Sequence, residues 1–153
     1  MKHYPIPSHR LHEIVRATKC LQAGEAVAFL NKGSKGKKLD VRLDLVDGEF
    51  VGLRLFVHCG DHEKIKSYES GLCVAGPRVR GIGYSPVKVM RKYKAFIPKG
   101  WHENVIDPNL PDTDDDANRH IALPGFDPTD LQDFTRKSAK RWHIDLEYGE
   151  DLL

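Results

Sequence analysis

Residues 39–59 contain the pattern that most restricts what this chain can fold into. Apolar residues alternate with polar ones from Leu39 to Leu45, and a second alternating run follows from Phe50 to Cys59. A period of two places apolar side chains on one face of a strand and polar side chains on the other. The dipeptide Asp47-Gly48 between the runs is typical of a tight β-turn. The sequence therefore predicts a half-buried antiparallel hairpin.

Two helices are predicted, one near each end of the chain. Ser8 can cap a helix over residues 8–22, whose apolar positions recur every three or four residues, and Gly24 can end it. A second helix is predicted to begin within Asp127-Pro128-Thr129-Asp130, where Asp127 can cap it, Pro128 takes the first helical position and the first turn is acidic. Further strands are predicted at these positions: 25–30, 71–75, 78–84, 87–97 and 143–148.

These elements predict an α+β fold, in which an N-terminal and a C-terminal helix pack on one face of an antiparallel sheet. The 153 residues are expected to form a single domain. Residues 98–126 are expected to form a long irregular loop, because they contain several prolines and little regular pattern. A loop of this length in a small domain is usually functional or mobile.

Composition excludes several classes of protein. There is no apolar run of about 18 residues, so a membrane-spanning helix is not expected. The N-terminus lacks the apolar core of a secretion signal, and the three cysteines cannot form a closed set of disulfides. We therefore expect a cytoplasmic protein without membrane partners. No cofactor and no bound metal are predicted.

Basic residues concentrate between Pro77 and Lys99, where the sequence has no acidic residue. Lysine and arginine displace counterions from a phosphate backbone, and aromatic rings stack on unpaired bases. This stretch therefore predicts a nucleic-acid-binding surface, although it can also be the solvated outer face of a sheet. The candidate residues are Arg78, Arg80, Tyr84, Lys88, Arg91, Lys92, Tyr93, Lys94 and Lys99.

Histidines supply candidates for acid–base chemistry near neutral pH. His58 ends a predicted strand, and His102 and His120 lie in or beside the predicted loop. If they converge near Arg78 or Arg80, they can form a metal-free ribonuclease site. One imidazole would then remove the 2′-hydroxyl proton, a second would protonate the leaving oxygen, and a cation would stabilise the phosphorane. A zinc site built from the same histidines is the competing arrangement.

Acidic residues dominate the next stretch, from Trp101 to Asp116, which has no lysine or arginine. A mobile, solvated loop is one interpretation. The stretch can also cover a basic surface of a protein partner, as can the acidic C-terminal tail. This pattern supports an alternative function: a non-enzymatic interaction protein, such as an antitoxin, a nuclease inhibitor or an anti-defence factor.

Two segments and the C-terminal helix–strand unit resemble small bacterial toxin–antitoxin proteins, especially TumE-like toxins and related uncharacterised domains. The segments run from Arg78 to Tyr84 and from Phe96 to His102, and the similarity spans roughly residues 71–146. Those families tend to have His-x-His after the proline, whereas this chain has His102-Glu103-Asn104. The resemblance implies growth inhibition through an RNA target, with an antitoxin as partner. The leading hypothesis is therefore a toxin-type or mobile-element protein that binds or cleaves RNA.

Overall fold

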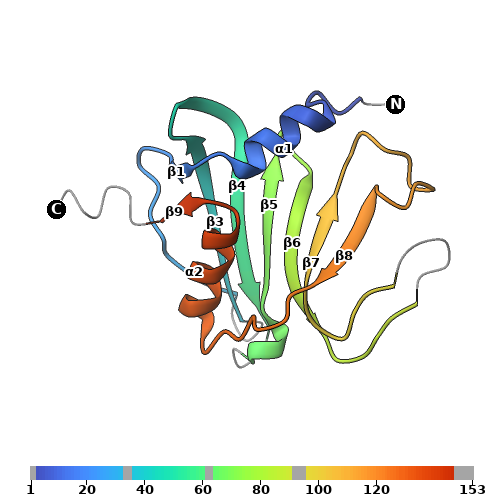
Figure 1. Ribbon diagram of the computed structural model, residues 1–153. Coiled ribbons are helices and arrows are strands. Elements are labelled where there is room, and N and C mark those ends of the chain that lie inside the picture. The colour runs from blue at the N-terminus through green and yellow to red at the C-terminus, as the bar shows by residue number, and fades with distance from the viewer. Residues whose placement is uncertain (1–2, 33–35, 61–63, 91–95, 147–153) are drawn as a thin grey trace.

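The computed structural model describes residues 3–32, 36–60, 64–90 and 96–146. Within these ranges nine strands form one sheet (Figure 1), in the order β8-β7-β6-β5-β4-β3-β1-β9, and β2 pairs with β3. All strand pairs are antiparallel except β1 and β9, which are parallel. The elements are α1 (Ser8–Arg16), β1 (Lys19–Leu21), β2 (Leu30–Asn31), β3 (Lys37–Leu45), β4 (Gly48–Cys59), the 3₁₀ turn η3 (Ile65–Ser67), β5 (Glu69–Val74), β6 (Arg78–Ser85), β7 (Gly100–Ile106), β8 (Asn118–Ala122), α2 (Leu131–Arg141) and β9 (Ile144–Asp145).

The predicted hairpin is confirmed as β3 and β4, at the centre of this sheet. Leu39 pairs with Val57 and Leu43 with Leu53, and all four side chains are buried. The residues that alternate with the buried ones, Asp40 and Arg42 on β3 and Arg54 and Phe56 on β4, are partly or fully exposed. The alternation in the sequence therefore gives the sheet one apolar face and one polar face.

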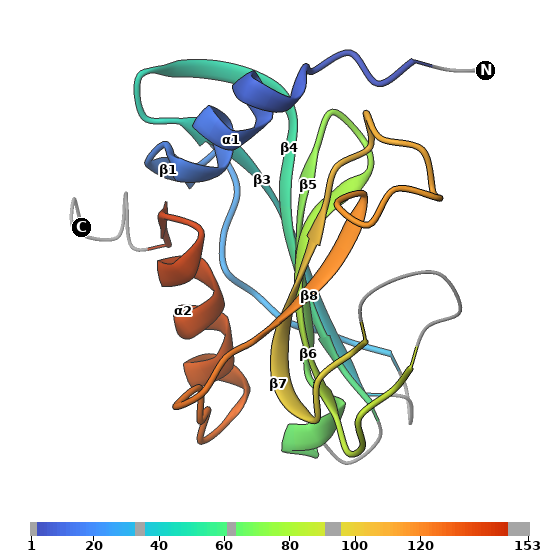
Figure 2. The same cartoon turned by 45° about the vertical axis from the view of Figure 1, so that its right-hand side comes forward.

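Helices α1 and α2 lie on the same side of the sheet, and no helix of the described ranges lies on the other side (Figure 2). Leu11 and Ile14 of α1 and Phe134 of α2 are almost completely buried against the apolar face, as is Trp142 directly after α2. Burying a large apolar side chain stabilises a fold by about 1.5–3 kcal/mol. We call the two sides the helix face and the uncovered face.

The predicted α+β class is wrong, because strands rather than helices make up most of the fold. In the described ranges the two α-helices have 9 and 11 residues, whereas the sheet has nine strands and mixed pairing. No helix in these ranges is long and apolar enough to cross a membrane. The sequence does not reveal this class, because several strands lie in segments without a clear period of two.

The segment 98–126 accounts for two of those strands. It was predicted to be an irregular loop, but it contains β7 and β8, which extend the sheet beyond β6. The predicted strand at 25–30 is reduced to β2. Of the strand predicted at 87–97, the structure shows an isolated bridge between Val89 and Ile97, and residues 91–95 lie outside the described ranges.

Neither helix has both the bounds and the capping residue that the sequence predicts. Helix α1 ends at Arg16 instead of residue 22, because residues 19–21 form β1 between β3 and β9. Ser8 does not cap α1; its hydroxyl donates to the Asp107 carboxylate at 2.6 Å. In α2 the capping residue is Asp130, which accepts a hydrogen bond from the Asp133 amide.

Lys19 joins the ends of the two helices. Its side chain is fully buried, and Nζ donates to the carbonyl oxygens of Val15 and Ala17 at the end of α1, at 2.7 and 2.8 Å. It also donates to the Trp142 carbonyl after α2, at 2.7 Å. The last carbonyls of a helix lack partners within the helix. One ammonium group therefore satisfies carbonyls from both helices and fixes their positions on the sheet.

Candidate functional site

Arg78 and Arg80 lie on opposite faces of the sheet. The register between β5 and β6 shifts between Leu72 and Cys73, so that Cys73 pairs with Arg78 while Leu72 pairs with Arg80. Arg78 is exposed on the uncovered face, and Val79 and Arg80 are buried. In a regular strand both arginines would lie on one face, opposite Val79. A β-bulge changes this arrangement, because the extra residue reverses which side the following side chains occupy.

Arg80 is a buried cation with little compensation from the protein. Its side chain is 7% exposed, and Nη1 donates to the carbonyl of Val79 at 2.7 Å. No described carboxylate lies within ion-pair distance of it. Burial lowers the pKa of Arg80, and the nearby Arg119 and Arg141 lower it further, whereas Glu103 and Asp107 raise it. Most of its five N–H donors therefore have no acceptor in the described part of the chain.

Arg80 lies in a cavity of about 580 Å³ between α1, the end of α2 and strands β6 to β8. Three further arginines and two histidines line this cavity: Arg16, Arg119, Arg141, His12 and His143. The carboxylate among the lining residues, Glu103, accepts hydrogen bonds from Arg141 Nη2 at 2.9 Å and from Trp142 Nε1 at 2.7 Å. Four arginines against one carboxylate leave this cavity strongly positive.

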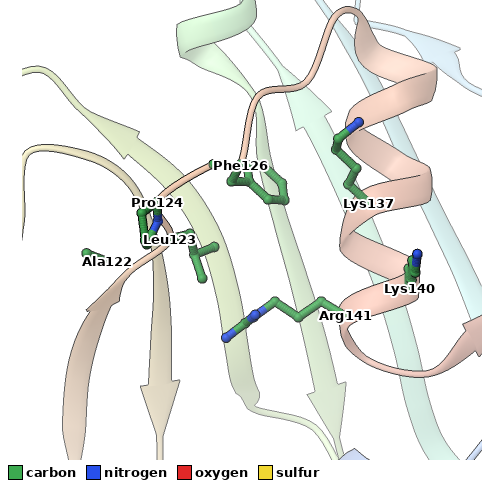
Figure 3. Close-up of a pocket in the computed structure, with 8 residues that line it drawn as sticks. Ala122, Leu123, Pro124, Phe126, Lys137, Lys140 and Arg141 are labelled. Carbon is green, nitrogen blue, oxygen red and sulfur yellow. The ribbon is translucent and has the colours of Figure 1, made fainter.

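A second hollow, of about 600 Å³, lies along α2 and shares Arg141 with this cavity. It is also lined by Lys137, Lys140, Phe126 and residues 122–125. Figure 3 shows the Arg141 side chain extending from the end of α2 across the gap toward the sheet. We call the lining of these two adjacent hollows the basic groove; it comprises Arg16, Arg80, Arg119, Lys137, Lys140, Arg141, His12, His143 and Phe126.

Beyond Arg80 the positive charge of the lining is balanced. A third hollow of about 340 Å³ shares Arg80 and Arg119 with the first, but it is also lined by Asp107 and Asp116. Asp107 accepts hydrogen bonds from Ser8 and from the Asn109 backbone amide, which hold its pKa below its usual value despite partial burial. Asp116 lies 3.6 Å from Arg119. Part of the acidic stretch therefore ends the excess of positive charge at this end of the basic groove.

The three candidate histidines lie on the uncovered face, away from the basic groove. His58 of β4 forms an ion pair with Glu69 at 3.0 Å, and that contact holds the pKa of Glu69 below its usual value. His102 of β7 and His120 of β8 contact each other, with ring centroids 5.1 Å apart. Three strand spacings separate β4 from β7, so His58 and His102 are about 14 Å apart.

The histidines therefore do not meet at one point. The described residues hold no group of three or more metal-ligating side chains, so the competing zinc arrangement is not formed there. His102 and His120 remain close enough to act on one group. Arg78 shares their face, whereas Arg80 does not.

The other predicted binding residues are scattered. Tyr84 packs edge-on against Trp101, with Lys66 Nζ 5.4 Å from its ring centroid. Lys88 lies over the Phe96 ring at 3.9 Å, and Lys99 is exposed. Arg91, Lys92, Tyr93 and Lys94 lie outside the described residues.

Most of the basic groove was missed at the level of sequence. Its arginines come from α1, β6, β8 and the end of α2, which are separated by long stretches of chain. A local signal existed only in α2, whose last turns are basic, but this was attributed to the helix dipole. Comparison with protein-family models, with curated proteins and with solved structures finds no match.

Proposed function

We propose that this protein binds single-stranded nucleic acid, and RNA in particular, along the basic groove. The observation that carries the proposal is Arg80, a buried guanidinium without a carboxylate partner among the described residues. An uncompensated buried charge costs several kcal/mol, and a bound anion offsets that cost. Phosphate oxygens match the planar fork of a guanidinium and accept two hydrogen bonds from it.

The length of the groove favours a polyanion over a small ligand. Lys140 continues the positive charge along α2, where Lys137 pairs with Asp133 at 2.8 Å. Phe126 adds an aromatic side chain to the lining, and its ring also packs against Trp101 and Phe134. Basic side chains that follow a backbone, together with aromatic rings, are typical of surfaces that bind single strands.

The geometry favours binding over cleavage. Of the three histidines predicted as catalytic, His102 and His120 are close enough to act as an acid–base pair, but they face away from the groove. A phosphate held by Arg80 is therefore on the other side of the sheet from them. The ribonuclease hypothesis built on these three histidines loses the cation that it required, although His12 and His143 line the groove itself.

A protein partner for the acidic stretch has less support. Asp107 is bonded to Ser8 and Asn109, Asp116 lies near Arg119, and Asp114 accepts from the Asp116 amide. These carboxylates are therefore engaged within the fold. Growth inhibition and an antitoxin partner, which the resemblance to TumE-like toxins implies, stay predictions.

Fluorescence anisotropy with a labelled single-stranded RNA tests the proposal. The affinity should fall steeply between about 50 and 200 mM salt, with a log–log slope of about −0.7 for each phosphate contacted. Arg80→Met, which replaces a buried charge by an apolar side chain of similar length, should weaken binding about tenfold or more. A DNA strand of the same sequence shows whether the groove distinguishes the two sugars.

Arg42→Ser is the matched control. Arg42 is an exposed arginine of the uncovered face that pairs with Glu25 at 2.9 Å, so its loss should leave RNA affinity unchanged. The proposal is overturned if the wild-type protein shows no salt-dependent binding, or if Arg80→Met and Arg42→Ser weaken it equally.

A further inference from the structure

The excess of positive charge in the basic groove ends beyond Arg80, where two carboxylates join the lining. We call this its closed end, in the sense that the carboxylates disfavour a further phosphate. Lys137, Lys140 and Arg141 line its open end, and Asp107 and Asp116 line the hollow beyond Arg80. A chain of phosphates that entered along α2 would meet like charges if it continued past Arg80. Repulsion between those carboxylates and a phosphate would disfavour any such path.

The burial of Arg80 also limits which phosphates of a strand can reach it. Arg16, Arg119 and Arg141 at the rim are exposed, whereas Arg80 is 7% exposed. Leu11 and Trp142, which are 1% exposed, also line the hollows around it. An internal phosphate carries a nucleotide on each side, so both neighbours must fit beside it. A phosphate at the end of a strand has one such neighbour and can enter a closed site.

The charge of the site also suits a terminal group. A phosphate monoester carries a charge of about −1.5 to −2 at neutral pH, whereas an internal phosphodiester carries −1. Arg80 has no described carboxylate partner, and Arg119 faces Asp116 at a loose 3.6 Å. Two guanidinium groups are thus available to one doubly charged phosphate.

From these observations we infer that the closed end of the basic groove recognises the terminal phosphate of a nucleic-acid strand. The inference rests on the proposed function, since it specifies which part of the strand Arg80 holds. Arg80 and Arg119 donate to the terminal phosphate, and Arg141, Lys140 and Lys137 follow the next phosphates along α2. The acidic pair Asp107 and Asp116 excludes a strand that would pass through.

The test compares RNAs of one sequence that differ only at their ends: a 5′-phosphate, a 3′-phosphate, or hydroxyls at both ends. One phosphate-ended RNA should bind about tenfold or more tightly than the RNA with hydroxyl ends, because a charge-assisted hydrogen-bond pair is gained. The two phosphate-ended RNAs identify which end is recognised. A mononucleotide with the same terminal phosphate should compete at higher concentration.

Protein variants separate the closed end from the rest of the groove. Arg80→Met should remove the preference for the phosphate-ended RNA and leave weak, salt-dependent binding to both RNAs. Lys140→Ser should weaken the binding of both by the same factor and keep the preference. Asp116→Asn should reduce the preference, because it removes part of the barrier to a passing strand. Thermal melting of each variant checks that it folds.

The outcomes are distinct. Equal affinity for phosphate-ended and hydroxyl-ended RNA, with binding still sensitive to salt and to Arg80→Met, overturns the terminal-phosphate inference and leaves the proposed function standing. Absence of salt-dependent binding to every RNA overturns both. Retention of the full preference by Arg80→Met would show that the terminal phosphate lies elsewhere on the protein.

Discussion

Lys19 and Arg80 are two buried cations on the helix face, and they differ in how many hydrogen-bond acceptors the protein offers them. Lys19 uses its three N–H donors on three carbonyl oxygens, all within 2.8 Å. Within the described ranges Arg80 has a single acceptor, the carbonyl of the residue before it. A fully bonded charge stabilises the elements around it, whereas an incompletely bonded one favours an external anion. Lys19 is therefore structural, and Arg80 is the residue on which binding depends.

Lys19→Met should destabilise the fold. It leaves three helix-end carbonyls without a donor, and each buried polar group without a partner costs about 1–3 kcal/mol, partly offset by the loss of a buried charge. We expect a loss of about 2 kcal/mol in the free energy of unfolding, measured by urea denaturation at pH 6. Lys64→Met, at an exposed lysine, is the control and should have little effect. Equal stability of Lys19→Met and wild type would show that the three carbonyls are satisfied in another way.

The same lysine predicts a pH dependence. Burial, with a contribution from the Arg80 charge, lowers the pKa of Lys19 to about 7, from 10.5 in an unfolded chain. Between these values the unfolded chain binds the extra proton, so the stability contributed by this group rises with pH from about 7 to about 10 and is constant below that window. Urea denaturation of wild type and Lys19→Met at pH 6, 8 and 9.5 measures this. A stability gap that does not change with pH would contradict the lowered pKa.

At the scale of elements, the prediction succeeded where a local pattern was decisive. The alternation from Leu39 to Cys59 fixes which face of each strand is buried. The turn falls on Val46 and Asp47, and the pairing register shifts between Leu43 and Leu45. The sequence could not indicate the bulge at Arg78 or the strands in residues 98–126. Those features depend on hydrogen bonds to β5 and β6, which are not local in the sequence.

The start of α2 gives a test at this scale, because the capping residue was assigned wrongly. Asp130 accepts from the Asp133 amide at 2.7 Å, and the Asp133 carboxylate accepts from the Thr129 amide at 2.9 Å. Asp130→Ala should reduce the free energy of unfolding by about 1 kcal/mol, as measured by chemical denaturation. Asp127→Ala, at the exposed residue that the sequence suggested as the cap, should leave it unchanged. The reverse result would place the start of α2 three residues earlier.

At the scale of the whole molecule, the candidate site is a product of topology. Strands β1 and β9 bring the ends of α1 and α2 side by side. Because these helix ends face β6, β7 and β8, the arginines of all these elements come together in the basic groove. The basic residues from Arg78 to Lys99 predicted one surface. In the structure the described residues of this run do not share one face, because neighbouring residues of a strand point to opposite faces and β6 contains a bulge. Of the predicted phosphate-binding residues that the structure describes, Arg80 is the one that lies in the groove.

The separation of the two faces leads to a final prediction, about cleavage. RNA held in the basic groove cannot reach His102 and His120, so these two histidines should not cleave a labelled RNA at neutral pH, with or without EDTA. A variant with both histidines changed to asparagine should bind that RNA with wild-type affinity, since neither side chain faces the groove. Gel analysis of the incubated RNA and anisotropy with the variant provide the two measurements. If the RNA is cleaved, and cleavage is lost in the double variant but retained in Arg80→Met, the uncovered face is a second and catalytic site for RNA.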